Sequence, residues 1–332
     1  MARILGIETS CDECAAAVVD DRHHVRSSVV ASQIELHRQY GGVVPELAAR
    51  HHVEAIGAVV SEALQQAGTD LGSIDAVAVT QGPGLVGSLL VGLCTAKAIA
   101  WERRLPLLAV HHLEGHIRSA FIEHPEIEFP AIALVVSGGH TSLYLCPVED
   151  SYRLLARTRD DAAGEAFDKV AKLLGLGYPG GPIIDRLARD ADERAFEFPQ
   201  AQMKDHSLDF SFSGIKSAVR RQVQRTAVPP ERLGDFVASF QRAVVEALVR
   251  HTLRACRTEA IRTVLVTGGV ACNSRLRQAF AAAAETEGLR VYIPAPRYTT
   301  DNAAMIAAAG FLHLERRRFA PLDVNADASL RL

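Results

Sequence analysis

The chain has 332 residues, of which 48 % are hydrophobic and 23 % are charged. That length suggests about two domains, and the composition is that of a globular protein with a sizeable core. Lys and Arg number 36 against 39 Asp and Glu, so the formal net charge is −3. This balance excludes recruitment of nucleic acid by overall positive charge. An RNA partner would have to be held by a local basic patch or by another subunit.

The sequence gives no sign of export or of membrane insertion. Its first residues lead directly into a strand pattern, without the long apolar stretch of a signal peptide. No apolar run reaches the about 18 residues needed to cross a bilayer. The six cysteines are scattered, which favours a reducing compartment over a disulfide framework. We therefore expect a cytoplasmic protein.

The first third of the chain contains three features in order. Two apolar runs, 3–9 and 15–19, predict strands on either side of the polar turn 10–14. A third strand, 74–80, leads into a glycine turn and a small-residue helix. A fourth, 105–110, ends at His111 and precedes a helical pattern.

The same three features recur later in the chain. The corresponding strands are expected over 131–136, 142–146, 261–267 and 289–293, with an Ala-rich helix over 302–317. A hairpin followed by alternating strands and helices predicts an α/β fold, and the repetition predicts two similar lobes. The N-terminal lobe is expected over 1–125 plus about 302–332. The C-terminal lobe is expected over 126–301, with an insertion at about 150–260. Ligands of such sheets bind at the carboxyl ends of the strands, so we expect the turns to face one cleft.

The first candidate site is a metal centre. His112 and His116 are spaced i and i+4, which places both imidazoles on one face of a helix. Asp301 follows the matching strand of the second lobe, so we expect it to complete the set across the cleft. Two histidines and one carboxylate suit one divalent ion per subunit. Such a set fits Fe²⁺ or Zn²⁺, and the residues alone do not choose between them. A zinc protease would place its Glu directly after the first histidine, whereas here Leu113 stands there.

The second candidate site is a nucleotide pocket in the second lobe. Glycine turns such as Gly138-Gly139 let backbone N–H groups converge on phosphate oxygens, and Ser137 adds a hydroxyl. Asn273 lies near a helix start, which favours anionic and polar ligand atoms. The carboxylates of Asp168 and Asp185 would suit ribose hydroxyls.

Eight segments make the sequence similar to one family. They are GIETSCDE at 6–13, TQGPGLVGSLLVG at 80–92, HHLEGH at 111–116, LVVSGGHT at 134–141, GEAFDKVAKLLGLGYPGGP at 164–182, FSFSGIK at 210–216, TGGVACNSRLR at 267–277 and TDNAAMIA at 300–307. On these the chain resembles the bacterial tRNA adenosine threonylcarbamoyltransferases, formerly described as O-sialoglycoprotein endopeptidases. One departure is Cys14, where the family usually has Thr; it stands three residues after Cys11.

The resemblance implies the actin-like ATPase fold of actin, sugar kinases and heat-shock chaperones. It implies transfer of the threonylcarbamoyl group from threonylcarbamoyl-AMP to the N6 amine of adenosine 37 in tRNAs that read ANN codons. The nucleotide would then be an ATP/AMP-type part of the substrate. Implied partners are tRNA, a paralogous subunit of the same fold (TsaB) and a small ATPase (TsaE).

The resemblance also implies residue roles. His112, His116 and Asp301 would be the metal ligands, and Asp12 or Glu13 would be the catalytic proton relay. The substrate or nucleotide contacts would be Val136, Ser137, Gly138, Gly139, His140, Asp168, Gly181, Asp185 and Asn273. Three alternatives stay open at this point: an O-sialoglycoprotein metalloendopeptidase, a non-catalytic nucleotide-dependent scaffold, and a sugar or acetate kinase.

Overall fold

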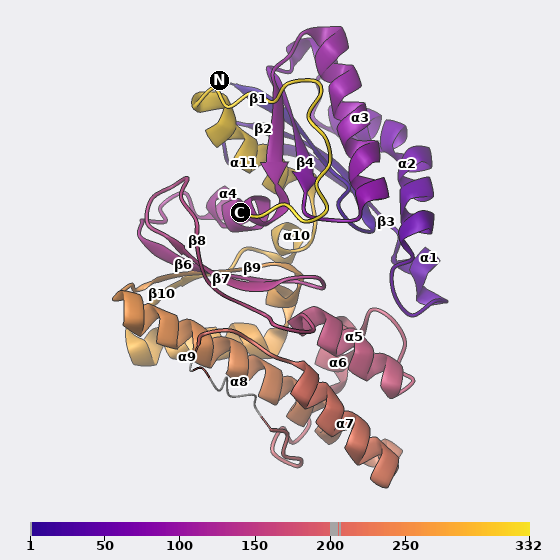
Figure 1. Ribbon diagram of the computed structural model, residues 1–332, viewed down its shortest axis with the longest axis vertical. Helices are drawn as coiled ribbons and strands as arrows, with labels where there is room; N and C mark the ends of the chain where they lie inside the picture. Colours follow the sequence, from indigo (N-terminus) through magenta and orange to yellow (C-terminus); the bar gives the residue numbers. More distant parts are fainter. Residues whose placement is uncertain (1, 200–204, 206) are drawn as a thin grey trace. The chain divides into compact units, whose positions relative to one another are not determined.

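The computed structural model describes residues 2–199, 205 and 207–332. It divides into two compact units, 1–127 with 297–332, and 128–296. Each unit is built on one five-stranded mixed sheet (Figure 1). None of the helices in the described ranges is long and apolar enough to cross a bilayer.

The two sheets share one topology. The first has the order β3-β2-β1-β4-β5 and the second has the order β10-β9-β6-β7-β8. In both, a hairpin pair is antiparallel and the later strands are parallel to the first strand. The predicted repetition is therefore confirmed at the level of strand order and direction. The strands are β1 (Arg3–Glu8), β2 (Glu13–Asp20), β3 (His24–Ser32), β4 (Ala76–Gly82), β5 (Leu107–His111), β6 (Ala131–Val136), β7 (Thr141–Cys146), β8 (Arg153–Arg157), β9 (Thr263–Thr267) and β10 (Arg290–Tyr292).

Helices cover both faces of the first sheet. Leu5 and Ile7 of β1 point into the core formed with α2 (Pro45–Gln66) and α3 (Val86–Arg103). Ile4 points to the other face, where α11 (Ala303–Glu315) packs. This alternation follows from the two-residue repeat of a strand. A short α1 (Ile34–Arg38) precedes α2, and α4 (His112–Glu123) packs beside α11.

The close contact between β1 and α11 depends on one glycine. A Cβ atom on Gly6 would lie 2.3 Å from the backbone oxygen of Ala303. Any side chain there would push α11 away from the sheet, because backbone cannot rotate aside as a side chain can. The sequence of β1 therefore sets where the start of α11 sits.

The second unit carries additional helices between β8 and β9. They are α5 (Ala163–Leu173), α6 (Gly180–Leu187) and α7 (Ser213–Arg225), followed by the long α8 (Leu233–Glu259). Helix α9 (Ser274–Glu287) follows β9, and the short α10 (Pro296–Thr299) spans the point where the chain returns to the first unit. Because β8 pairs with β7, the added segment begins after Arg157 and not at residue 150 as expected. Strands β3 and β8 lie at sheet edges and bury few of their residues, so their sequences carry little pattern.

Candidate metal centre and nucleotide pocket

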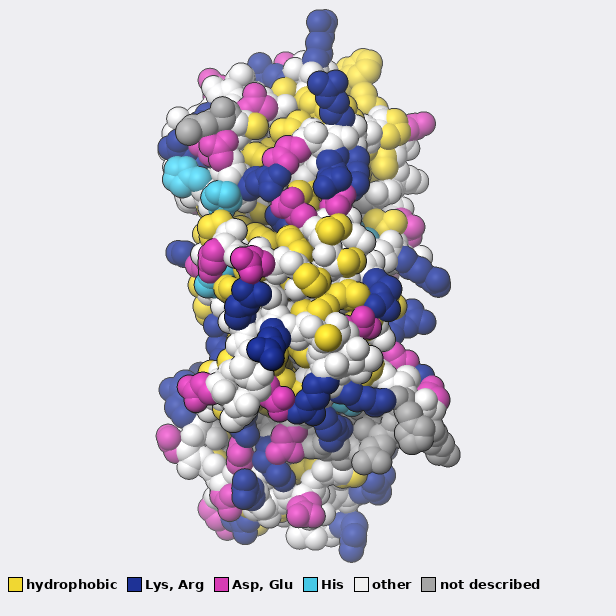
Figure 2. Space-filling model, turned by 90° about the vertical axis from the view of Figure 1, so that its left-hand side faces the viewer, with side chains coloured by type: hydrophobic (Ala, Val, Ile, Leu, Met, Phe, Trp, Pro, Cys, Tyr) yellow, Lys and Arg dark blue, Asp and Glu magenta, His cyan; other side chains and the backbone are white. Residues whose placement is uncertain are grey.

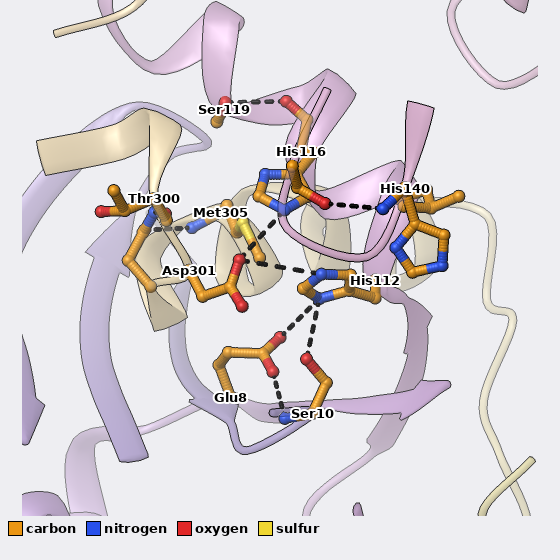
Figure 3. A network of polar contacts seen from close by, with 12 residues as sticks. Glu8, Ser10, His112, His116, Ser119, His140, Thr300, Asp301 and Met305 are labelled. Carbon is orange, nitrogen blue, oxygen red and sulfur yellow. Dashed lines mark hydrogen bonds and ion pairs between the residues drawn. The ribbon is translucent and has the colours of Figure 1, made fainter. Parts of the chain in front are cut away.

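Helix α4 presents His112 and His116 on one face, as their spacing predicts. Strand β5 ends at His111 and α4 begins at the next residue. The two rings stand edge to face with centroids 4.7 Å apart. Both histidines are buried, and His116 is fully so. Their side chains converge with Asp301 in Figure 3.

Two residues bring Asp301 to this pair. Gly115 lies between the histidines, and a Cβ atom there would come within 2.8 Å of Ile306 on α11. The glycine therefore lets α11 pack closely against α4. Asn302 caps α11 by accepting a hydrogen bond from Met305 N at 3.0 Å, and this cap fixes the turn that carries Asp301.

Asp301 belongs to the same unit as the histidines. The expected lobe boundary placed it at the end of the second lobe, across a cleft, but the first unit resumes at Arg297. The reason is the packing of α11 on β1 and α4, which ties the residues just before α11 to the first sheet. The three side chains therefore form a site within one compact unit.

The geometry of the three side chains fits a shared cation. Asp301 Oδ1 lies 3.1 Å from His116 Nε2 and 3.8 Å from His112 Nε2. One ligand atom from each residue falls within 4.8 Å of the others. Ligands about 2.1 Å from one ion stand about 3.0–3.5 Å apart, close to the two distances from Asp301 Oδ1. Nε2 of His116 is buried against the Asp301 carboxylate, where a shared metal would bind it, and Nδ1 is buried without a hydrogen-bond partner among the described residues.

Glu8 holds the other side of the His112 ring. Its Oε2 lies 3.2 Å from His112 Nδ1, and Ser10 Oγ lies at the same distance from that nitrogen (Figure 3). Glu8 is fully buried and also accepts hydrogen bonds from Ser10 N and Thr80 Oγ1. A carboxylate on Nδ1 orients the ring so that Nε2 faces the ion site, an arrangement common behind metal-binding histidines.

The carboxylates around His112 control its charge. Burial alone would lower the pKa of His112, but Glu8 and Asp301 raise that pKa to about 9. Burial lowers the pKa of His116, and Asp301 offsets only part of this effect. The pKa shifts of the two histidines have opposite directions because only His112 has a second carboxylate against its ring.

Asp12 and Glu13 lie where the first polar turn meets β2. Glu13 Oε1 accepts a hydrogen bond from Ser32 Oγ at 2.9 Å, whereas Oε2 is buried without a hydrogen-bond partner among the described residues. Burial and the neighbouring charge of Asp12 raise the pKa of Glu13 to about 8. The pKa of Asp12 is also raised, first by burial and partly by the charge of Asp301. Both groups can therefore change protonation closer to neutral pH than ordinary carboxylates.

Glu114 is turned away from the two metal-site histidines. Its Oε2 lies 3.1 Å from Nε2 of His313 on α11, and the residue is buried. A metalloprotease needs a carboxylate aimed at the metal-bound water. The one glutamate inside the histidine motif thus has a different, structural partner.

The second unit contains a cavity of about 350 Å³, in the size range of small-molecule sites. It lies among α5, α6 and the start of α9. Five predicted residues line it: Gly138, Asp168, Gly181, Asp185 and Asn273. Phe167, Tyr178 and Val270 supply an apolar wall. An apolar wall with a few convergent polar groups is typical of a site for a planar heterocycle with attached hydroxyls.

Three of the polar lining residues also hold the local backbone. Asp168 Oδ1 accepts a hydrogen bond from Gly180 N at 2.7 Å. Asp185 Oδ1 accepts from both the backbone and the hydroxyl of Ser274. Asn273 caps α9 through Leu276 N at 2.9 Å. These side chains therefore fix the cavity wall as well as line it.

The other predicted nucleotide contacts lie outside the lining of this cavity. Val136 is fully buried in β6, so its side chain belongs to the core. Ser137 and His140 close a tight turn: Ser137 N donates to His140 O at 2.8 Å, and His140 N donates to Ser137 Oγ at 3.1 Å. Gly138 and Gly139 form its exposed tip. The Ser137 hydroxyl, expected to meet a phosphate, thus already accepts a backbone hydrogen bond.

Sequence reasoning missed three residues of these sites. Glu8 sits within an apolar strand pattern, and nothing in its spacing from His112 indicates contact. Arg186 and Arg189 line the cavity from the end of α6. Their i, i+3 spacing directly after Asp185 was the available signal, since it places both on one side of the helix.

The fold and the two sites define a class of protein: an α/β protein of two actin-like ATPase lobes with a candidate metal triad in one lobe. Among solved structures, full-length HypF in its phosphate- and nucleotide-bound form matches 94 % of this chain and 46 % of its own, with a TM-score of 0.59 and 15 % identity. Component A of the (R)-2-hydroxyglutaryl-CoA dehydratase of Acidaminococcus fermentans covers 93 % of this chain and 97 % of its own, with a TM-score of 0.54 and 16 % identity. These likenesses confirm the predicted fold class.

The family follows from the sequence comparisons. The profile described as "TsaD: tRNA N6-adenosine threonylcarbamoyltransferase" matches residues 24–308. The protein of that name from Anaeromyxobacter sp. (strain Fw109-5) is 54 % identical over 99 % of this chain and 100 % of its own. That of Moorella thermoacetica is 52 % identical over 99 % of this chain and 97 % of its own. The chain belongs to the tRNA N6-adenosine threonylcarbamoyltransferase family, which confirms the resemblance found in its motifs.

Proposed function

We propose that this protein transfers the threonylcarbamoyl group of threonylcarbamoyl-AMP to the N6 amine of adenosine 37 in tRNAs that read ANN codons. The observation that carries the proposal is identity above 50 % along the whole length of proteins named for that transfer, together with a preformed triad. In the reaction the amine nitrogen bonds to the carbamoyl carbon, the bond from that carbon to the phosphate oxygen breaks, and AMP leaves. The amine gives up one proton.

His112, His116 and Asp301 would hold one divalent ion, Fe²⁺ in the favoured case and Zn²⁺ in the other. Bound there, the ion would supply a Lewis acid that orients and polarises oxygen atoms of the donor. Two imidazoles and one carboxylate leave coordination positions open for such atoms. The fit is supported by the distances from Asp301 to the two histidines and by the burial of His116 Nε2 against that carboxylate.

Asp12 and Glu13 are the proposed acceptors of the amine proton. A base works best when its pKa lies near the working pH, and the raised pKa of Glu13, about 8, supports this assignment. The cavity lined by Asp168, Asp185 and Asn273 is the proposed site for the adenosine part of the donor. Transfer then depends on positioning more than on a strong base, because the leaving group already carries a phosphate.

The acceptor RNA requires local positive charge, because the overall charge is negative. Figure 2 shows lysine and arginine side chains interspersed with acidic ones over the face in view. Arg220, Arg221 and Arg225 on α7 are exposed, and two of them line a groove with Phe196 and Phe198. We propose this groove as one RNA contact. A paralogous subunit of the same fold and a small ATPase are the proposed protein partners, and the cytoplasm is the proposed location.

The test is modification of tRNA by wild-type protein and by His112→Ala. Both would be supplied with the partner proteins, threonylcarbamoyl-AMP, unmodified tRNA and Fe²⁺ or Zn²⁺. Mass spectrometry of nucleoside digests should find the threonylcarbamoylated base with wild type and its loss with His112→Ala, with circular dichroism unchanged. Full modification by a metal-free His112→Ala protein would refute the mechanism. Absence of transfer by wild type, with nucleotide still bound, would favour the scaffold alternative.

A further inference from the structure

The segment after α11 runs along the first unit and is tied to it by backbone hydrogen bonds. Ala320 N donates to Leu107 O at 2.8 Å, and Asp327 N donates to Gln81 O at 3.0 Å. Ala320, Val324 and Ala326 pack against the core formed with α2 and α3. Residues 319–332, which we call the C-terminal strap, thus run from the amino end of β5, at Leu107, to the carboxyl end of β4, at Gln81. The end of the chain can be followed to this region in Figure 1.

Gly82 permits the closest approach of the strap. A Cβ atom on Gly82 would lie 1.9 Å from the backbone oxygen of Asp327. No side chain can be accommodated there without moving the strap, because the obstructing atom is backbone. The fit of the strap at the end of β4 is therefore specific and not a loose surface contact.

Beyond this point the strap contacts His111, the residue before α4. Nε2 of His111 lies 3.1 Å from Leu330 O, which can only accept, so Nε2 carries the proton. Nδ1 accepts a hydrogen bond from Leu113 N at 3.0 Å, which makes His111 the N-cap of α4. The strap carbonyl therefore selects the one neutral tautomer in which His111 can cap the helix.

We propose that the C-terminal strap, acting through the Leu330 carbonyl and His111, holds the first turn of α4 so that His112 is positioned as a metal ligand. His111 is thus a positioning residue. The inference rests on the proposed metal site and adds to it a control point formed by the end of the chain. Release of the strap would free His111 to rotate or change tautomer. Leu113 N would then lose its hydrogen-bond acceptor, and the turn that begins with His112 would loosen.

The experiment measures Zn²⁺ affinity of the full-length protein and its variants by competition with a chromophoric chelator. Truncation after Ser329 removes the Leu330 carbonyl, whereas truncation after Arg331 keeps it as an amide carbonyl and is the matched control. The first should weaken Zn²⁺ binding about fivefold, the size of one lost N-cap, and the control should change it less than about twofold. Hydrogen exchange of the Leu113 amide in metal-free protein should quicken in parallel.

Two variants of His111 separate positioning from general stability. His111→Ala should weaken Zn²⁺ binding by a similar factor, and truncation after Ser329 should add little to it, because both remove the same link. His111→Asn places an amide oxygen at the N-cap, and this oxygen can accept the Leu113 N–H without help from the Leu330 carbonyl. The variant should therefore keep near wild-type Zn²⁺ affinity and be insensitive to the truncation. A general loss of stability would not produce this pattern.

The outcomes distinguish the strap from the metal site. Equal effects of truncation after Ser329 in wild type and in His111→Ala would overturn the strap proposal, as would no effect in either. Lack of Zn²⁺ affinity in the wild-type protein itself would overturn the proposed metal site, and this inference with it. If wild type binds Zn²⁺ and the losses from the truncation and from His111→Ala are non-additive, both the strap proposal and the metal site are supported.

Discussion

Replacement of Glu8 by Gln tests the carboxylate behind the metal-site histidine. The substitution keeps the shape of the side chain but removes the charge against His112 Nδ1, at 3.2 Å. Glu8 is fully buried, so solvent cannot compensate for that loss. Loss of the residue that hydrogen-bonds the outer nitrogen of a metal-binding histidine lowers metal affinity about 10- to 100-fold, equivalent to about 1.4–2.7 kcal/mol of binding free energy. We expect Glu8→Gln to fall in this range.

The assay is competition for Zn²⁺ at pH 7.5 with a chromophoric chelator. Glu114→Gln is the matched control, because Glu114 is also a buried carboxylate with a histidine partner, His313, but belongs to no part of the triad. It should bind Zn²⁺ within about twofold of wild type. Equal affinities for wild type and Glu8→Gln, or equal losses for the two variants, would refute the assignment of Glu8 as the residue that orients His112.

Three further predictions concern stability and metal. Gly6→Ala should lower the free energy of unfolding by more than about 2 kcal/mol, because its methyl group would meet the backbone of α11. Gly57 is exposed in α2 with open space around it, so Gly57→Ala should be neutral or stabilising. Urea unfolding of the two variants and wild type measures the difference. Asp20 is paired with Arg3 and Arg26, and this pairing holds its pKa below the ordinary value against the effect of burial. Asp20→Asn should therefore cost about 1–3 kcal/mol at pH 7, and the difference should shrink as the pH falls below about 4 and wild-type Asp20 takes up its proton. Prolonged chelation should abolish tRNA modification with little change in circular dichroism, and added Fe²⁺ or Zn²⁺ should restore it; modification that survives chelation would contradict the metal requirement.

Much of the architecture followed from local pattern. Apolar runs bounded by turn residues located eight of the strands, and their repetition indicated two sheets of like topology. The strands β3 and β8 were not predicted, because few of their side chains are buried and their sequences show no clear apolar run or alternation. The spacing of His112 and His116 placed them on one helical face, since a helix repeats every 3.6 residues.

Contacts between distant segments depended on the tertiary structure alone. Glu8 reaches His112 across 104 positions, and Leu330 reaches His111 across 219, so no periodicity links these pairs. Asp301 joins the first unit because α11 packs against β1 at Gly6 and against α4 at Gly115. The sequence determines which side chains can bind a metal or donate a proton. The repeat of a helix or strand determines on which face of that element each side chain lies. Which of them meet is decided by close packing of whole elements, where a single missing Cβ atom determines how near two backbones can come.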